Sequence, residues 1–188
     1  MPAGAIVYDP AYRDHNTGDH IESKSRIEAI MERIREDEHA RCVQILKPFK
    51  ATPDQVGANH DVQYIASVRR LAEAGGGWLD LDTYCSSNSY EVALLAVGGV
   101  ICAVDAVTAD VHNVMAIVRP PGQNFAARAS ATGLNWTNRL AIRISETRSG
   151  RGFDLSRDFT LKHESASFVR SSSSLLVIIF VYSSLPRV

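Results

Sequence analysis

The front part of the chain alternates short apolar runs with amphipathic segments. Residues 5–8 form a continuous apolar run that ends before Asp9 and Pro10. Because proline disfavours helical geometry in the residue before it, this pattern predicts a buried strand that runs into a loop. A polar loop over residues 12–23 follows, and then a predicted amphipathic helix with its apolar side chains on one face. Those side chains are Ile27, Ile30, Met31 and Ile34.

The alternation continues through residue 77. Residues 43–46 predict a second strand, which Pro48 ends. Thr52 followed by Pro53 is typical of a helix start, with Thr52 as the N-cap. Residues 62–74 predict a further amphipathic helix, which the three glycines at 75–77 end.

A long apolar segment then leads into the last clear strand of this region. After a polar loop over residues 86–89, residues 90–107 are apolar nearly all round and rich in Ala and Gly, which predicts a buried helix. Residues 114–118 predict a strand that runs directly into Arg119-Pro120-Pro121-Gly122. Alternating strands and helices favour an α/β fold with a mainly parallel sheet. Active sites of such sheets lie on loops after the carboxyl ends of strands, here residues 9–23, the region after residue 46, and residue 119 onward.

The pattern weakens after residue 144. Residues 145–174 are rich in Ser and Arg, have little periodicity, and predict loop or disorder. Residues 175–182 form an apolar run that is too short to span a membrane and predicts a buried strand. We therefore divide the chain into residues 1–144, a folded α/β part, and residues 145–188, a divergent tail.

Composition excludes some function classes. The chain has 188 residues, 20 basic and 21 acidic, so its formal net charge is −1 and no basic excess favours nucleic acid as a partner. Cys42, Cys85 and Cys102 are widely spaced and form no CxxC pair, which is typical of reduced thiols. The N-terminus shows no basic segment followed by an apolar stretch, so we expect a cytoplasmic protein with neither a signal peptide nor a membrane span.

Several short motifs occur together in a fixed order. They are Tyr8-Asp9-Pro10; Thr17-Gly18-Asp19-His20-Ile21-Glu22-Ser23 with Arg26; His60-Asp61 with Tyr64-Ile65; Asp80-Leu81-Asp82-Thr83-Tyr84; Ser89-Tyr90-Glu91-Val92-Ala93 with Gly98-Gly99; and Arg119-Pro120-Pro121-Gly122. In this order and spacing, the chain resembles the histone deacetylase superfamily of arginase/deacetylase-like zinc amidohydrolases, closest to its bacterial, archaeal and class II branches. The resemblance covers residues 5–143, frays from Gly133, and is lost beyond Ile144. It implies an incomplete three-layer α/β fold, with a mainly parallel sheet flanked by helices.

The resemblance also implies a chemistry. Members of this superfamily hydrolyse acetyl-lysine amides or related acyl-amides such as acetylpolyamines, with a zinc ion that polarises the carbonyl and activates a water. A histidine pair after the proline-glycine loop serves as general base and acid, and a later tyrosine stabilises the oxyanion. Two aspartates and a histidine from later in the chain hold the metal. The resemblance therefore implies zinc as the cofactor and acetylated lysine or polyamine as the ligand class.

The chemical residues of the family carry over poorly. The histidine pair falls on Gln123 and Asn124, and an amide cannot take up a proton near neutral pH. The Asp-x-His strand end that supplies metal ligands in the family is absent. The late candidates Asp154, Asp158 and His163 lie in the Ser/Arg-rich tail, where we interpret them as solvated loop residues. We therefore predict no catalytic residue and no metal ligand in this chain.

The substrate-binding residues carry over better. The resemblance places His20 and Glu22 in the loop that forms the entrance and one wall of the site, although both can equally serve to hold that loop. Asp82 matches an acidic residue that grips the substrate backbone, and an N-cap role is its rival. Gly122 ends the proline-glycine loop. For Arg119 we expect hydrogen bonds to neighbouring carbonyls rather than substrate contact, and for His15 and His60 a local hydrogen-bonding role.

Three functional hypotheses remain open at this point. The chain is a truncated deacetylase homologue without catalysis, a non-catalytic module that retains the entrance loops, or an active metallohydrolase with rearranged ligands or a partner chain. In each case a chain that ends after the front half leaves a sheet edge open, which favours partner binding or a homo-oligomer. The apolar run at 175–182 is a candidate for an extra strand at that edge.

Overall fold

The computed structural model describes residues 4–20, 22–58, 60–81, 83–109, 111, 113–120, 166–170 and 176–180. Its centre is a five-stranded sheet in the order β2-β1-β5-β7-β6. β1 pairs in parallel with β2 and β5, β5 pairs in parallel with β7, and β6 runs antiparallel to β7. The strands are β1 Ala5–Val7, β2 Gln44–Leu46, β5 Asn113–Ile117, β6 Ala166–Arg170 and β7 Leu176–Phe180.

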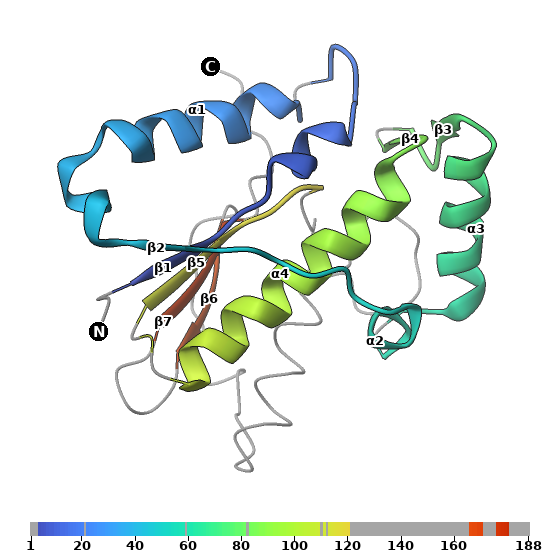
Figure 1. Cartoon of the computed structure of the whole chain (residues 1–188). Coiled ribbons are helices and arrows are strands. Elements are labelled where there is room, and N and C mark those ends of the chain that lie inside the picture. The colour runs from blue at the N-terminus through green and yellow to red at the C-terminus, as the bar shows by residue number, and fades with distance from the viewer. Residues whose placement is uncertain are drawn as a thin grey trace.

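Helices cover both faces of this sheet. Figure 1 shows the strands passing between α1 (Lys24–Glu36) and the long helix α4 (Ser89–Ala109). Ile27 and Met31 are the buried residues of α1, and they pack in one cluster with the β1 and β5 side chains and with Val100 of α4. The apolar stripe of α1 thus packs against the sheet, as its spacing predicts. The fold is the three-layer α/β arrangement expected from the sequence.

The far side of α4 carries a second apolar cluster. There α2 (Pro53–Gly57) and α3 (Val62–Glu73) pack their buried side chains, among them Val56 and Val68, against Val97 of α4. Because α4 has the sheet on one side and these helices on the other, it is apolar nearly all round. By length and composition α4 is apolar enough to cross a membrane, but 78% of that window is buried inside the fold, as in a core helix.

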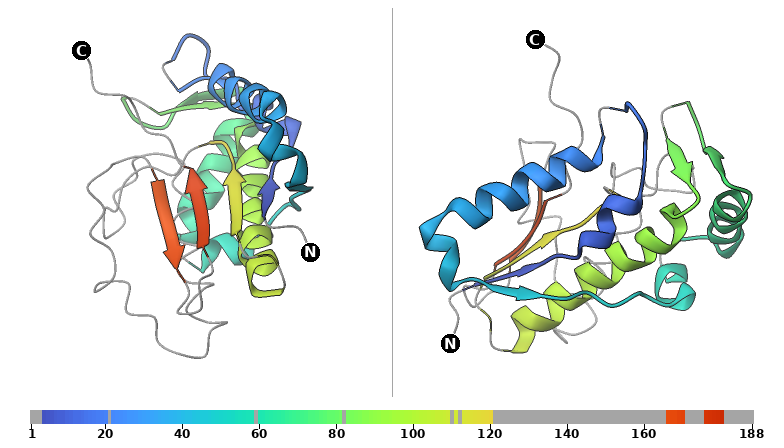
Figure 2. Two further views of the ribbon diagram at one scale, coloured as in Figure 1. Left: turned by 90° about the vertical axis from the view of Figure 1, so that its left-hand side faces the viewer. Right: turned by 45° about the horizontal axis from the view of Figure 1, so that its top comes forward.

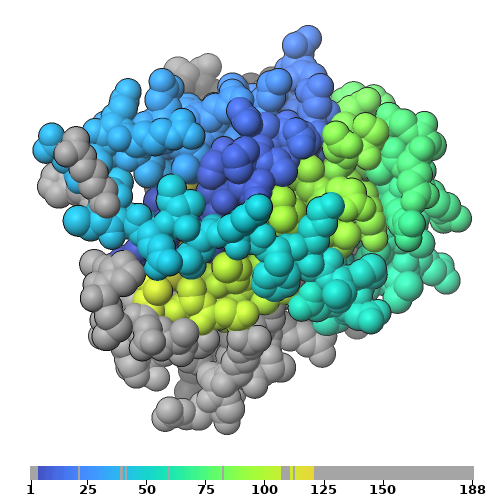
Figure 3. All heavy atoms as spheres, in the orientation of Figure 1, coloured from blue at the N-terminus to red at the C-terminus, as the bar shows by residue number. Residues whose placement is uncertain are grey.

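Two adjacent glycines allow the layers to approach α4 closely. A Cβ on Gly98 would lie 1.7 Å from the carbonyl oxygen of Phe49, in the segment that crosses α4 between β2 and α2 (Figure 3). A Cβ on Gly99 would lie 2.6 Å from the Tyr12 hydroxyl. Tyr12 belongs to the 3-10 helix η1 (Pro10–Asp14) and is fully buried, with its hydroxyl donating to the Leu95 carbonyl. These two contacts explain why side chains are missing at 98 and 99.

Most elements expected from the sequence are confirmed. The helix start at Thr52 is a full capping box, in which Thr52 Oγ1 accepts from Gln55 N and Gln55 Oε1 accepts from Thr52 N. The apolar run near the C-terminus contains β7, which extends the sheet beside β5 as the candidate extra strand. A second 3-10 helix, η2 (Glu38–Cys42), joins α1 to β2.

Two elements depart from the sequence prediction. The segment predicted as loop or disorder over residues 145–174 contains β6, whose order comes from its pairing with β7 rather than from its own periodicity. Gly76 and Gly77 do more than end a helix, because they lie in β3 (Gly76–Trp78), which forms a hairpin with β4 (Tyr84–Ser86). Glycine has no side chain that could alternate between the two faces of a strand, so no strand pattern is visible there; their φ angles, 101° and 158°, are ones that other residues rarely adopt.

Candidate functional site

Three segments meet beyond the carboxyl ends of β1 and β5. They are the loop after β1, which we call the entrance loop (residues 12–22), the hairpin with the N-terminus of α4, and residues 118–120 after β5. Because β1 and β5 are parallel neighbours, their following loops leave the sheet at the same edge. Both views in Figure 2 show the entrance loop and the hairpin rising from that edge. The position is where an α/β sheet places its site.

Arg119 is buried at the centre of this meeting point. Its side chain is only 2% exposed, and each of its three side-chain nitrogens bonds to the entrance loop. Nη1 donates to the carbonyls of Tyr12 and His15, and Nη2 to Thr17 Oγ1 and to the Glu22 carbonyl. Arg119 makes the hydrogen bonds to carbonyls that the sequence led us to expect, but these carbonyls belong to the entrance loop and not to the loop of Arg119 itself.

The charge of Arg119 is balanced by Glu22. Arg119 Nε lies 2.7 Å from Glu22 Oε1 and Nη2 lies 2.8 Å from Oε2, so the pair is bidentate. The Glu22 side chain is 15% exposed. A bidentate, mostly buried pair of this kind is among the stronger polar contacts in a protein. Of the two roles left open for Glu22, the contacts are those of the loop-holding one.

His15 and two serines hold the other side of the entrance loop. His15 Nδ1 lies 2.6 Å from Ser89 Oγ, and Ser89 Oγ also lies 2.9 Å from Ser86 Oγ and accepts from Ser86 N. Asn16 N donates to Ser86 Oγ. One arrangement of protons satisfies each group: Asn16 N donates to Ser86 Oγ, the Ser86 hydroxyl donates to Ser89 Oγ, and the Ser89 hydroxyl donates to His15 Nδ1. In this arrangement the ring proton of His15 is on Nε2, which lies 3.8 Å from Glu22 Oε2. The entrance loop is thus attached to the hairpin and to α4.

The environment of His15 keeps its ring neutral. Its pKa is lowered to about 3, chiefly by burial and then by the nearby charge of Arg119 and the His20 ring. A neutral ring has one donor and one acceptor nitrogen, which fits the contact with Ser89. His15 is therefore a local hydrogen-bonding residue, as expected from the sequence.

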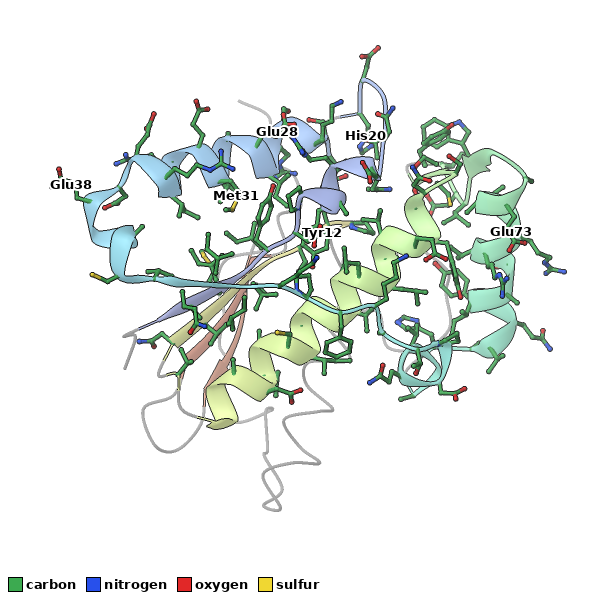
Figure 4. The ribbon with its side chains drawn as sticks, in the orientation of Figure 1. Tyr12, His20, Glu28, Met31, Glu38 and Glu73 are labelled. Carbon is green, nitrogen blue, oxygen red and sulfur yellow. The ribbon has the colours of Figure 1, made fainter. Side chains whose placement is uncertain are left out.

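His20 lies at the outer turn of the same loop. Figure 4 shows it above Tyr12, on the side of the molecule that carries the hairpin. Its Nδ1 accepts from Glu22 N at 3.0 Å, and its own N–H donates to the Thr17 carbonyl. His20 is partly exposed, so the substrate-binding role predicted for it stays a prediction alongside its role in the turn.

The hairpin forms the opposite rim. Thr83 Oγ1 donates to Asp80 Oδ2 at 3.0 Å, and Leu79 N donates to the Thr83 carbonyl. Trp78 packs edge-on against Tyr84, with ring centroids 5.2 Å apart, and Leu81 is fully exposed. Burial, followed by the charge of Asp80, raises the pKa of Tyr64 behind the hairpin to about 12.

Other predicted residues lie outside the described part of the chain. They are Asp82, Gly122, Gln123, Asn124, Asp154, Asp158 and His163. Their roles stay predictions. Among the residues that the structure describes, no group of three or more His, Cys, Asp or Glu side chains could hold a metal ion, so these residues do not fit a zinc site.

Sequence reasoning missed the serine half of this arrangement. Ser86 and Ser89 appear in the chain as a polar stretch before an apolar helix, which is a common helix-start signal and carries no sign of a histidine partner. Ser89 is fully buried, and its partner His15 lies 74 residues earlier. Only the arrangement of the sheet brings the two together.

Comparisons with known proteins agree with this geometry. The model of the histone deacetylase domain matches residues 20–155, which extends beyond Ile144, where we placed the end of the resemblance. A probable deacetylase of Methanothermobacter thermautotrophicus is 31% identical over 160 residues, which cover 84% of this chain and 47% of that protein. The human polyamine deacetylase HDAC10 is 31% identical over 141 residues, covering 70% of this chain and 21% of that protein.

A solved structure shows the same fold. The HD domain of HDA15 superposes with a TM-score of 0.68 at 22% identity, covering 77% of this chain and 43% of that one. The chain therefore spans less than half the length of the relatives that it matches. The sheet with its flanking helices, the ordered motifs and the domain match together show that the chain belongs to the histone deacetylase family.

Proposed function

We propose that this chain carries the entrance scaffold of a histone-deacetylase-type domain and does not hydrolyse acyl-amides on its own. The observation that carries the proposal is the sequence after β5. The proline-glycine loop of the family is present at residues 119–122, and it leads into Gln123 and Asn124, where the family resemblance places a histidine pair. Carboxamides neither accept nor release a proton near neutral pH, so general acid–base catalysis has no carrier at these positions.

The zinc requirement of the family points the same way. A zinc ion needs three protein ligands and an open position to activate water. The described residues supply no such group, and the late candidates Asp154, Asp158 and His163 follow no apolar strand that would present them. We therefore propose that the chain as it stands binds no catalytic zinc.

The ligand class follows from the family and from the named relatives. One relative is a probable deacetylase and another a polyamine deacetylase. We propose acetylated lysine or an acetylated polyamine as the class of molecule for which this entrance is shaped, with His20, Asp82 and Gly122 as its contacts. The cytoplasm, where both kinds of molecule occur, is the proposed location.

Turnover assays test the proposal. The purified chain is incubated with an acetyl-lysine peptide and with acetylspermidine, with and without added zinc, beside a zinc deacetylase of known activity as the positive control. We expect no turnover above the protein-free background. Chelator-sensitive turnover that requires zinc would overturn the proposal. The double variant Gln123→His, Asn124→His restores the histidine pair but adds no metal ligand. We therefore expect it to stay inactive.

A second candidate is a binding module without catalysis. The specific observation in its favour is that the entrance loop is fixed on two sides, by Arg119 and by the Ser86–Ser89 pair, and a preordered loop loses less entropy when it binds. Calorimetric titration with acetyl-lysine and with acetylspermidine decides between the two. Saturable heat without turnover favours the module, and no saturable heat removes it.

A further inference from the structure

We propose that Arg119 is a positioning residue that fixes the entrance loop, and that Glu22 serves as its counter-ion rather than as a ligand contact. The inference rests on the proposed function only in taking this loop as the entrance. Its evidence is the pattern of contacts around a buried guanidinium.

The acceptors around Arg119 all come from one short stretch of chain. Tyr12, His15, Thr17 and Glu22 together supply three carbonyls, a hydroxyl and a carboxylate. A guanidinium has five N–H donors in a rigid plane, and this stretch meets all of them. Since Arg119 lies two residues after the end of β5, it connects the entrance loop to the sheet.

Many of the loop's other described hydrogen bonds are local. Its internal bonds join residues two to five positions apart: Gly18 N to Asn16 Oδ1, His20 N to the Thr17 carbonyl, Glu22 N to His20 Nδ1, and Thr17 Oγ1 to the Glu22 carbonyl. Such short turns shape a loop but do not hold it in place. In the described part of the loop, the bonds that reach distant parts of the chain are that of the Tyr12 hydroxyl to the Leu95 carbonyl, those to Arg119, at separations of about 100 residues, and those to Ser86 and Ser89.

The Glu22 carboxylate is fully occupied by its contacts with Arg119. Both of its carboxylate oxygens lie within 2.8 Å of Arg119 nitrogens, and its backbone carbonyl accepts from the same group. A ligand that used the carboxylate would leave the buried Arg119 cation without its counter-ion, which is costly because the charge is shielded from water. The family resemblance groups Glu22 with His20 as entrance residues, and the structure assigns the two to different tasks.

His15 connects the two attachments. Its carbonyl accepts from Arg119, while its ring binds Ser89 at the start of α4. Loosening the Arg119 side should therefore also loosen the contact with the hairpin side. This makes the entrance loop one unit rather than two independent turns.

Hydrogen–deuterium exchange with mass spectrometry tests the proposal in the folded full chain. Beyond η1, the described loop amides that donate hydrogen bonds are those of residues 16, 18, 20 and 22, and their exchange is compared with that of α3 in the same sample. The variants are Glu22→Gln, which removes the charge and keeps the shape, and Arg119→Lys, which keeps the charge and loses the planar fork. The control is Arg13→Ala, which removes an exposed arginine from the start of the same loop.

We expect both test variants to speed exchange in residues 14–22 at least tenfold more than they speed exchange in α3. Arg13→Ala should leave both regions unchanged. Unchanged loop exchange in Glu22→Gln would overturn the proposal, and so would an equal rise in α3, because that would mark general destabilisation rather than positioning. Since the readout involves neither turnover nor ligand, its failure is distinct from failure of the proposed function.

Discussion

The two rims of the candidate site are held by different physical means. The entrance loop, which lacks strand or long-helix structure beyond η1, is tied down by a buried ion pair and a chain of buried hydroxyls. The hairpin opposite is regular, yet its outer residues Trp78 and Leu81 are exposed. The contacts described at its tip include a backbone bond from Leu79 to Thr83 and a Thr83–Asp80 contact. Regular secondary structure is thus a poor guide to which rim is fixed, and buried polar contacts are the better one.

Of all the predicted changes, removal of the Arg119 guanidinium should lower the free energy of unfolding most. Arg119→Ala leaves the Glu22 carboxylate and three loop carbonyls without their donor, so we expect a loss of about 3–5 kcal/mol in the free energy of unfolding. Urea denaturation measures it. Arg13→Ala, with a half-exposed side chain, should change stability by less than about 0.5 kcal/mol. Equal losses of stability in Arg119→Ala and Arg13→Ala would show that the buried contacts of Arg119 have no special importance.

Glycine substitutions should distinguish the backbones of the two rims. Gly76 in the hairpin has a φ of 101°, and an added Cβ would lie 2.5 Å from the Cys85 carbonyl oxygen. Gly76→Ala should therefore cost about 2–3 kcal/mol. Gly18 in the entrance loop has a φ of 62° with nothing within 4 Å, so Gly18→Ala should cost only about 1 kcal/mol. Thermal and urea unfolding check both, and a larger loss at Gly18 would reverse the interpretation.

The neutral His15 predicts an acid sensitivity that belongs to the entrance rim. Its pKa is near 3 in the folded chain and near 6.5 unfolded, so below pH 6.5 the unfolded state binds one more proton. The resulting stability is present above pH 6.5 and falls by about 1.4 kcal/mol per pH unit as the pH drops towards 3.

His15→Asn keeps a polar partner for Ser89 and removes this titration. Between pH 7 and pH 5 the variant should therefore lose about 2 kcal/mol less stability than the wild type. Urea denaturation at each pH measures the difference. Parallel pH curves for the two proteins would show that His15 is not the group responsible.

The smallest effect is expected at the hairpin tip. Leu81 is fully exposed, so Leu81→Ser should change the free energy of unfolding by less than about 0.5 kcal/mol. A loss above about 1 kcal/mol by urea denaturation would show that the tip is packed against another part of the molecule.

Local pattern was enough to predict most of the fold and only part of the site. The stripe of α1, the Thr52 cap, the buried α4 and the strand before Arg119 follow from spacing and residue type, which act over a few residues. The carbonyl contacts of Arg119 were predictable too, because a buried arginine beside a loop needs acceptors. Its pairing with Glu22, 97 residues away, was not, since periodicity carries no information on contacts at that separation.

The same limit applies to the tail. β6 became a strand by pairing with β7, and the sheet order β5-β7-β6 is set by contacts between distant segments. The Ser- and Arg-rich composition around β6 predicted loop because composition reports the average of a segment and not its partner.

The contrast between the two rims can be measured directly in the unmodified protein. Hydrogen–deuterium exchange at single-amide resolution compares residues 16, 18, 20 and 22 of the entrance loop with Leu79 at the hairpin tip, whose amide donates to the Thr83 carbonyl. If the buried Arg119–Glu22 pair orders the entrance loop, its amides should exchange at least about tenfold more slowly than that of Leu79, after correction for intrinsic rates. Equal rates, or slower exchange at Leu79, would contradict the account.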